Sequence, residues 1–306
     1  MRWRRVVSLV LFVLLAAAGV LYYIRHEERF RLITAVSADA IVVLVLLKGA
    51  LIVCFGYQVK VLTDHYGLNL SFSKWFGLSR MSTFLNLILP FGSGSSLKAV
   101  YLQKFHNLKF SSFIASGAIA GLIRVVITTF CAVLLLLSSG QPSTLLLLMA
   151  GGLFIGSLSF LLVGHRIDGR FFSFSNGLAS LVNEWRPIRT DHAMIGKLVI
   201  INSLIFAISC LEVYYSFRAF SIDASLASSG VIAAVTTFTG AMKLVPANLG
   251  IKEAVFMALS GFYGTGVNEG LHAAALHRII GTACTLLLAP GFAYPLSKKV
   301  AADKER

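Results

Sequence analysis

Long apolar runs recur along the whole chain and limit the folds that it can adopt. Six of them approach the roughly 20 residues that an α-helix needs to cross a ~30 Å hydrocarbon core. They cover residues 6–24, 38–57, 112–137, 144–163, 198–217 and 272–296. In lipid, backbone polar groups must be satisfied within the protein itself, so uninterrupted apolar runs of this length predict transmembrane helices. We therefore expect an all-α integral membrane protein, a single polytopic domain over residues 1–306 with about six full spans.

The composition agrees with a membrane protein and excludes several other classes. Only 13% of the 306 residues are charged, against about 25% in a typical soluble domain. The net charge of +14 does not indicate a nucleic-acid partner, because most basic residues lie between the apolar runs, where they orient the chain and meet anionic headgroups. The four cysteines fall inside apolar runs without metal-ligand spacing. We expect neither a metal site nor a cofactor.

Two further apolar stretches, residues 85–104 and 241–257, are interrupted in the same way. In each, a proline is followed four residues later by a glycine, then by a lysine near a helix start and by an arginine in the next span. These residues are Pro90, Gly94, Lys98 and Arg124 in the first copy, and Pro246, Gly250, Lys252 and Arg278 in the second. The proline-to-arginine spacings are 34 and 32 residues. The pattern predicts two copies of one unit, over about 38–137 and 198–296.

The interrupted stretches are too short to cross the bilayer as single helices. The arms of the first, residues 79–89 and 95–104, are each about ten residues long, or about 15 Å as α-helix. Irregular backbone at membrane depth is tolerated where protein buries it or where it lines a wet cavity. We therefore predict two re-entrant broken-helix hairpins. In the second, the first arm (227–245) is longer than its counterpart, so a full crossing is the alternative there.

The basic residues predict the orientation of this layout. With both hairpins returning to their own side and both termini in the cytoplasm, the inside segments hold 16 lysines and arginines and the outside segments hold 4. This satisfies the positive-inside rule. The polar segment 165–197 is then a cytoplasmic amphipathic linker, and the two hairpins enter from opposite faces. Two similar units of opposite orientation form an inverted repeat, a common plan of secondary transporters.

The hairpins and the cations near them form a candidate anion site. Helix N-termini at mid-membrane present free N–H groups and partial positive charge, and intramembrane cations are expensive unless they are paired. The candidate lipid- or anion-binding residues are Asn86, Gly92, Gly94, Lys98, Arg124, Gly250, Lys252, Glu253 and Arg278, with Arg80, Glu212 and Lys243 as further cavity-lining candidates. In the structural alternative, the two arginines only pair with Glu212, Glu253 or backbone carbonyls. No catalytic constellation is present in the sequence, so we do not expect an enzyme.

The same residues resemble the motifs of a known family. The pattern N-x-x-x-P-x-G-x-G followed by a basic residue, then P-x-x-L-G-x-x-E, then an arginine in the last span is similar to the lysylphosphatidylglycerol synthase transmembrane region. The matching residues are Asn86, Pro90, Gly92, Gly94, Lys98, Pro246, Gly250, Glu253 and Arg278. The resemblance covers about residues 5–297 and implies a flippase-like membrane domain. We expect a stand-alone member without the aminoacyltransferase domain of the full-length synthases.

Three functions are compatible with the sequence. The first is translocation of an anionic phospholipid or a polyprenyl-phosphate-linked glycolipid through a basic cavity between the repeats. The second is an integral-membrane transferase that uses a lipid-phosphate donor, and the third is a non-transporting accessory subunit of envelope assembly. In each case we expect a multi-pass protein of the bacterial cytoplasmic (inner) membrane whose partners are lipids with phosphate headgroups. Homo-oligomers and envelope-biosynthesis partners are both compatible with the sequence.

Overall fold

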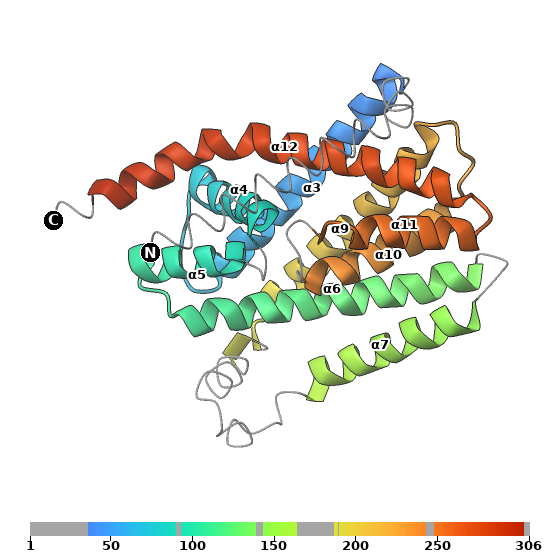
Figure 1. The fold of residues 1–306 in the computed structure, drawn as a ribbon. Helices are drawn as coiled ribbons and strands as arrows, with labels where there is room; N and C mark the ends of the chain where they lie inside the picture. The colour runs from blue at the N-terminus through green and yellow to red at the C-terminus, as the bar shows by residue number, and fades with distance from the viewer. Residues whose placement is uncertain are drawn as a thin grey trace, which may run out of the picture.

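The computed structural model describes residues 36–89, 93–138, 143–163, 187–188, 190–242 and 248–302. Within these ranges the chain is helical and contains no strand (Figure 1). The helices are α3 (Ala38–Asp64), α4 (Phe72–Ile88), α5 (Ser93–His106), α6 (Phe110–Ser138), α7 (Thr144–Val163), α9 (His192–Arg218), α10 (Leu226–Met242), α11 (Ile251–Phe262) and α12 (Val267–Ala302).

Five of these helices are long and apolar enough to cross a membrane. They are α3, α6, α7, α9 and the Val267–Ala289 part of α12. Their positions match five of the six predicted spans, whereas the predicted span over 6–24 lies outside the described residues. α7 packs along α6 and buries none of its own residues, as expected of a helix that faces lipid. The prediction of an all-helical, multi-pass membrane protein is confirmed.

Two element boundaries differ from the sequence prediction. The first hairpin arm, α4, begins at Phe72 and has 17 residues, where about ten were predicted over 79–89. It therefore equals α10, which also has 17 residues, and the predicted difference between these two arms was wrong. α9 begins at His192, so the end of the predicted surface linker is already helical. At 1.5 Å per residue, 17 residues span about 25 Å, still less than the ~30 Å hydrocarbon core.

The early start of α4 is explained by an aromatic cluster that packs against α3. Trp75 and Phe76 are buried, and both rings lie over Gly56 of α3. A Cβ atom at Gly56 would lie 2.8 Å from the Trp75 ring, so only glycine lets the two helices approach this closely. The sequence prediction began the arm only at Ser79, but Ser79 and Arg80 are both buried in this same core and the helix already starts at Phe72.

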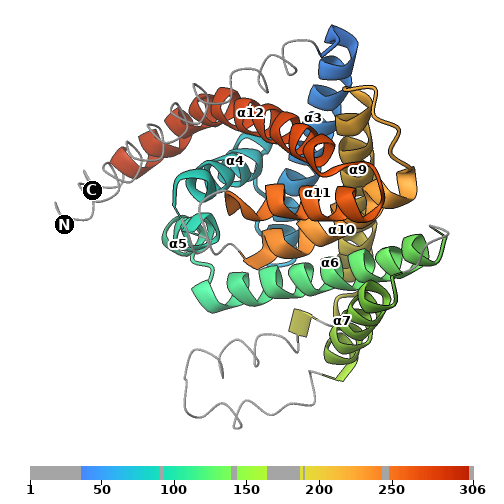
Figure 2. The ribbon, with the colours of Figure 1, turned by 45° about the vertical axis from the view of Figure 1, so that its right-hand side comes forward.

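The helices form a compact bundle around the pair α3 and α9, which pack side by side. Figure 1 shows α12 crossing one side of the bundle and α6 crossing the opposite side, and Figure 2 shows the same arrangement from a second direction. Each of these long helices contacts one arm of each hairpin: α12 packs on α4 and α11, and α6 packs on α10 and α5. The helix pairs α4–α5 and α10–α11, which correspond to the two predicted hairpins, are therefore held between α6 and α12.

The described helices of the two halves keep a constant register. α3 and α9 both have 27 residues, and α4 and α10 both have 17. Residue numbers in the second half are 154 higher at each end of these pairs, as in 38 and 192 or 88 and 242. The helix contacts repeat in the same way. The contact of α3 with α4 corresponds to that of α9 with α10, and the contact of α6 with α9 corresponds to that of α12 with α3.

α3 and α9 run antiparallel, as two side-chain contacts between them show. Lys48, in the N-terminal half of α3, forms an ion pair with Glu212, in the C-terminal half of α9. His65, just after the end of α3, contacts Asp191, which caps the start of α9. The His65–Asp191 contact therefore joins the C-terminal end of α3 to the N-terminal end of α9.

The Asp191 carboxylate is expected to contribute stability that depends on pH. It accepts a hydrogen bond from the Met194 backbone N–H at 2.9 Å, and its second oxygen lies 2.6 Å from His65 Nδ1. These two contacts hold the pKa of Asp191 below its usual range, and the hydrogen bond from the Met194 backbone has the larger effect. A carboxyl group whose folded-state pKa is lowered stabilises the fold above its ordinary pKa, and this stabilisation disappears as the pH falls through the folded-state value.

We expect Asp191→Ala to lower the unfolding free energy by about 1 kcal/mol at neutral pH, the usual cost of losing a helix cap. The difference from wild type should shrink once the pH falls below about 4, near the ordinary carboxyl pKa. Thermal unfolding in detergent over a pH series measures it. Asp223→Ala is the matched control, because Asp223 is 96% exposed beside Arg218. A destabilisation by Asp191→Ala that is the same at every pH would contradict the role of the charge.

Candidate functional site

The first hairpin brings its two arms into close contact at the start of α5. The backbone N–H of Gly94 donates to Asn86 Oδ1 at 2.9 Å, so Asn86 at the end of α4 caps α5. A Cβ atom at Gly94 would lie 2.0 Å from the carbonyl oxygen of Ser82. Glycine at 94 is therefore required for the approach of α4 and α5, a structural role that the anion-site hypothesis did not assign to it.

The second hairpin turns into α11 through residues with left-handed backbone. Asn248 has φ 50° and Gly250 has φ 81°, a region that glycine adopts without steric cost. The Glu253 side chain reaches back to accept the Gly250 backbone N–H at 3.0 Å. A carboxylate here satisfies one of the unpaired N–H groups of the helix N-terminus and complements its partial positive charge.

Glu253 also holds Arg278 of α12. The arginine donates from Nε and Nη2 to the two carboxylate oxygens, the Nη2 to Oε2 distance being 2.8 Å. Nη2 also donates to the backbone carbonyl of Asn248 at 3.2 Å. Both charged side chains remain 20% exposed. The predicted pairing of Glu253 with Arg278 is thus present, as a two-pronged, charge-assisted contact at a helix N-terminus that is partly open to the surroundings.

Arg124 of α6 is held quite differently. Its Nε donates to Asn202 Oδ1 at 2.9 Å and its Nη2 donates to Gln58 Oε1 at 2.6 Å. The guanidinium lies over the Phe55 ring, 4.9 Å from the ring centroid. No carboxylate among the described residues forms an ion pair with it. Neutral amides and an aromatic face stabilise its position without cancelling its charge.

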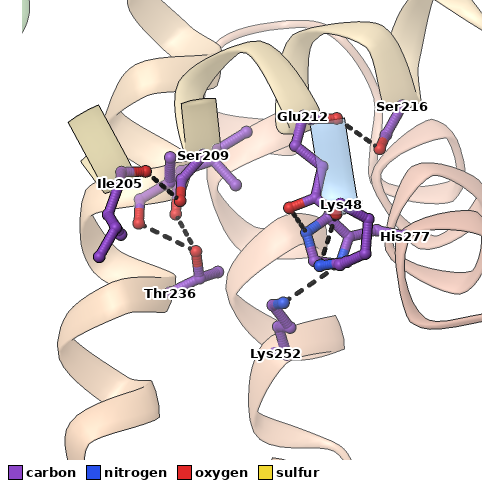
Figure 3. Close-up of polar contacts among 10 residues, drawn as sticks. Lys48, Ile205, Ser209, Glu212, Ser216, Thr236, Lys252 and His277 are labelled. Carbon is purple, nitrogen blue, oxygen red and sulfur yellow. Dashed lines mark hydrogen bonds and ion pairs between the residues drawn. The ribbon is translucent and has the colours of Figure 1, made fainter. Parts of the chain in front are cut away.

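A buried chain of four ionisable side chains joins α3, α9, α12 and α11 (Figure 3). Lys48 Nζ lies 2.5 Å from Glu212 Oε1, and His277 Nε2 lies 3.1 Å from Glu212 Oε2. His277 Nδ1 lies 3.1 Å from Lys252 Nζ. The side chains of Glu212 and His277 are only 3% and 7% exposed. Glu212, a predicted partner for an arginine, is therefore occupied by a lysine and a histidine instead.

The structure brings some predicted site residues together and separates others. Lys252, Glu253 and Arg278 meet at the α11–α12 contact, whereas Arg124 lies between α3 and α9. Lys98 is half-buried on α5. Arg80 is 2% exposed, donates to the Ile52 carbonyl and lies over the Phe76 ring, so its described contacts are those of a packed residue. Gly92 and Lys243, together with the hairpin tips at Pro90 and Pro246, lie outside the described residues.

Sequence reasoning did not assign Lys48, His277, Gln58 or Asn202 to the site. A signal for them exists in the register between the halves. Aligning Lys98 with Lys252 and Arg124 with Arg278 gives the same difference of 154 in both cases. In that register, Gln58 is the position equivalent to Glu212, and Lys48 is the position equivalent to Asn202. The two amides that hold Arg124 therefore correspond in register to Glu212 and its partner Lys48.

Comparison with known proteins decides the family. The sequence model of the lysylphosphatidylglycerol synthase transmembrane region matches residues 6–289.

The chain belongs to this family.

The match to the lysylphosphatidylglycerol synthase transmembrane region covers both halves of this chain, including α4 and α5, α10 and α11, Arg124 and Arg278. It confirms the resemblance inferred from the motifs. A search of curated proteins found no match to this sequence. Within the described part of this family member, histidine, cysteine and carboxylate side chains do not gather in groups of three or more that could hold a metal ion.

Proposed function

We propose that this protein moves a phosphate-bearing lipid across the membrane, and that it acts as a transporter rather than an enzyme. The observation that carries the proposal is the Arg278–Glu253 contact at the N-terminus of α11. There, the guanidinium of Arg278 from α12 meets the N-terminus of the short helix α11, and the Glu253 carboxylate bridges the two. Anionic headgroups are bound by this combination of groups.

The chemistry of the site supports exchange between two partners of Arg278. Without a ligand, Glu253 neutralises the guanidinium and occupies the Gly250 N–H. A phosphate offers oxygens of the same geometry to both donors, so it can replace the carboxylate without leaving either group unpaired. The cost of a lone cation in hydrocarbon, roughly 2.5–3.5 kcal/mol at a helix centre on insertion scales, is then avoided in both states. The exchange allows a headgroup to be bound and released again.

The balance of charge favours an anion as the ligand. The contacts described above involve four cations, Lys48, Arg124, Lys252 and Arg278, but only two carboxylates, Glu212 and Glu253. A phosphate headgroup would offset this excess. An anionic phospholipid and a polyprenyl-phosphate-linked glycolipid share this chemical group, and the site by itself selects neither.

We further propose that the two halves form an inverted repeat. Three observations support this architecture: the constant register of 154 residues, the exchange of packing partners between the halves, and the antiparallel pairing of α3 with α9. If α3 and α9 are equivalent helices, their antiparallel directions give the two units opposite orientations in the membrane. Such a repeat places the two hairpins on opposite faces, with the substrate path between the units.

The cellular setting is proposed on the same grounds. A multi-pass membrane protein with its basic segments on one side is expected to sit in the bacterial cytoplasmic membrane with both termini in the cytoplasm. The headgroup would then enter from one hairpin face and leave at the other.

The test is transport by the purified full chain in liposomes. We expect a fluorescent phosphatidylglycerol to cross the bilayer at least several times faster than in empty liposomes, and faster than fluorescent phosphatidylcholine, whose headgroup has no net charge. A polyprenyl-phosphate analogue in a parallel arm separates the two lipid classes. The absence of protein-dependent movement of all three lipids would refute the proposal.

A further inference from the structure

The buried chain from Lys48 to Lys252 has a hydrogen-bonding pattern that can hold a variable number of protons. His277 Nε2 faces the Glu212 carboxylate, which can only accept, so Nε2 carries a hydrogen. His277 Nδ1 faces Lys252 Nζ at 3.1 Å. One proton satisfies this contact in two ways, as an ammonium donating to a neutral imidazole or as an imidazolium donating to a neutral amine. Two protons would place a donor opposite a donor, so the protonation states that this contact allows give the Lys252–His277 pair a charge of zero or +1.

The corresponding position in the first half carries no such chain. There, Gln58 of α3 and Asn202 of α9 hold Arg124 of α6, and the register of 154 residues makes these two amides the counterparts of Glu212 of α9 and Lys48 of α3. Neutral amides thus suffice to tie these helices together around a cation. The second half uses ionisable residues for the same packing task, although buried ionisable groups inside a membrane are costly and are commonly functional.

The chain is also adjacent to the Arg278–Glu253 contact. Lys252 and Glu253 are consecutive on α11, and they meet the consecutive residues His277 and Arg278 on α12. The two contacts therefore form neighbouring rungs between the same two helices. A change of charge on the Lys252–His277 pair alters the electrostatic energy of the Arg278–Glu253 pair, because the poorly solvated interior screens charges weakly.

We propose that the Lys252–His277 pair is a proton-binding site, and that its protonation is coupled to occupation of the Arg278–Glu253 site by a phosphate-bearing anion. The coupling rests on the proposed function of that second site. The charged and titratable groups that face the pair are Lys48 of α3, Glu212 of α9, Glu253 of α11 and Arg278 of α12. An arriving anion favours the protonated, +1 form of the pair, so binding takes up protons from the medium.

Linkage makes this effect reciprocal. If anion binding takes up protons, the affinity for the anion must rise as the pH falls. One linked proton gives at most about a tenfold change in affinity per pH unit. A lipid transporter that works this way would draw on the proton gradient across the cytoplasmic membrane, because the side with the lower pH would favour the loaded form.

The experiment is a calorimetric titration of the purified full chain in detergent with dioctanoyl phosphatidylglycerol. Binding is measured in two buffers of different ionisation enthalpy and at several values between about pH 5 and 8, where an imidazole is the natural group to titrate. We expect proton uptake on binding and an affinity that rises as the pH falls. Inorganic phosphate, titrated in parallel, shows whether the linkage belongs to a lipid headgroup or to any phosphate.

His277→Asn locates the proton. The asparagine amide can still donate to Glu212 and accept from Lys252, but it does not titrate. Because Lys252 can still hold the shared proton in this variant, the deciding protein combines His277→Asn with Lys252→Gln. We expect the double variant to bind with the weaker affinity that wild type has at high pH, with no proton uptake and no pH dependence. His272→Asn on the same helix is the control and should behave as wild type. If His277→Asn does not fold, His277→Gln, which keeps the same amide, takes its place.

The outcomes separate this inference from the proposed function. If wild type binds neither phosphatidylglycerol nor inorganic phosphate, the coupling is overturned, whereas the proposed function is overturned only if transport of all three lipids also fails. Binding without proton uptake would overturn the coupling and leave lipid transport intact. Proton uptake that persists in the folded double variant, His277→Asn with Lys252→Gln, would overturn the assignment to the Lys252–His277 pair.

Discussion

Gly94→Ala is expected to destabilise the protein strongly, because the added Cβ atom has no space. It would lie 2.0 Å from the Ser82 carbonyl oxygen and 2.5 Å from the Ser82 hydroxyl. Overpacking of a close-packed site typically costs about 1–3 kcal/mol and occasionally more. We expect the upper end of this range, since the obstacle is backbone. The two arms must separate, which also moves the Gly94 N–H away from its cap at Asn86.

The control for this substitution is Gly121→Ala in α6, where nothing lies within 4 Å of an added Cβ atom. There the alanine should leave stability unchanged or raise it by about 0.5–1 kcal/mol, the usual difference between glycine and alanine inside a helix. Thermal unfolding in the same detergent compares both variants with wild type. Equal unfolding temperatures for Gly94→Ala and wild type would show that the α4–α5 approach is wrong.

Arg278→Gln is expected to reduce lipid transport by roughly ten- to a hundredfold. A hydrogen bond to a charged group contributes about 1.5–3 kcal/mol, and each 1.4 kcal/mol is a factor of ten. The glutamine amide can still donate a hydrogen bond toward Glu253, so the variant should insert and fold. Transport in liposomes and thermal stability of the same preparation are measured together. Arg218→Gln, at the exposed pair with Asp223, is the matched loss of an arginine and should transport as wild type.

Glu253→Gln is expected to have the opposite effect on binding. Removing the carboxylate leaves Arg278 without its resident anion, so a phosphate no longer has to displace one. The headgroup should bind more tightly and leave more slowly, and transport should fall through slow release. If the Arg278–Glu253 pair has a purely structural role, both substitutions should lower stability, and transport should fall only in proportion to the loss of folded protein.

The spans were predictable because length and apolar composition alone determine them. α6, α7 and the apolar part of α12 match the predicted runs closely. The start of α4 was not predictable in this way, since polar residues near it suggested the end of a loop. Arg80 and Ser79 are buried through tertiary contacts with α3 and with aromatic rings, and such contacts leave no local periodicity in the sequence.

The candidate site was predictable only where its residues share a motif. Glu253 and Arg278 follow the second hairpin in the expected order, and the structure pairs them. Lys48 and His277 were not predicted to belong to the site, because nothing near either residue in sequence reveals its partner. Their partner Glu212 lies 164 residues from Lys48 and 65 from His277. Only the fold brings these three together.

The neutral amides Gln58 and Asn202 illustrate a different limit. Single polar residues are common in apolar helices, so the sequence did not indicate a functional role for either Gln58 or Asn202. Their significance lies in the register of the two halves, which sets them opposite Glu212 and Lys48. The motif around the prolines gave a difference of 156 residues, from Pro90 to Pro246 and from Gly94 to Gly250. That local offset concealed the constant value of 154 that holds in the helices on either side.

The central claim is that Arg278 exchanges Glu253 for a phosphate headgroup, and ligand-induced thermal stabilisation measures this most directly. A ligand that binds only the folded state stabilises it by about 2.7 kcal/mol at one hundred times its Kd. With dioctanoyl phosphatidylglycerol we predict the largest rise in unfolding temperature for Glu253→Gln, a smaller rise for wild type and the smallest for Arg278→Gln. Dioctanoyl phosphatidylcholine should shift all three less. An equal rise for wild type and a folded Arg278→Gln variant would contradict the account.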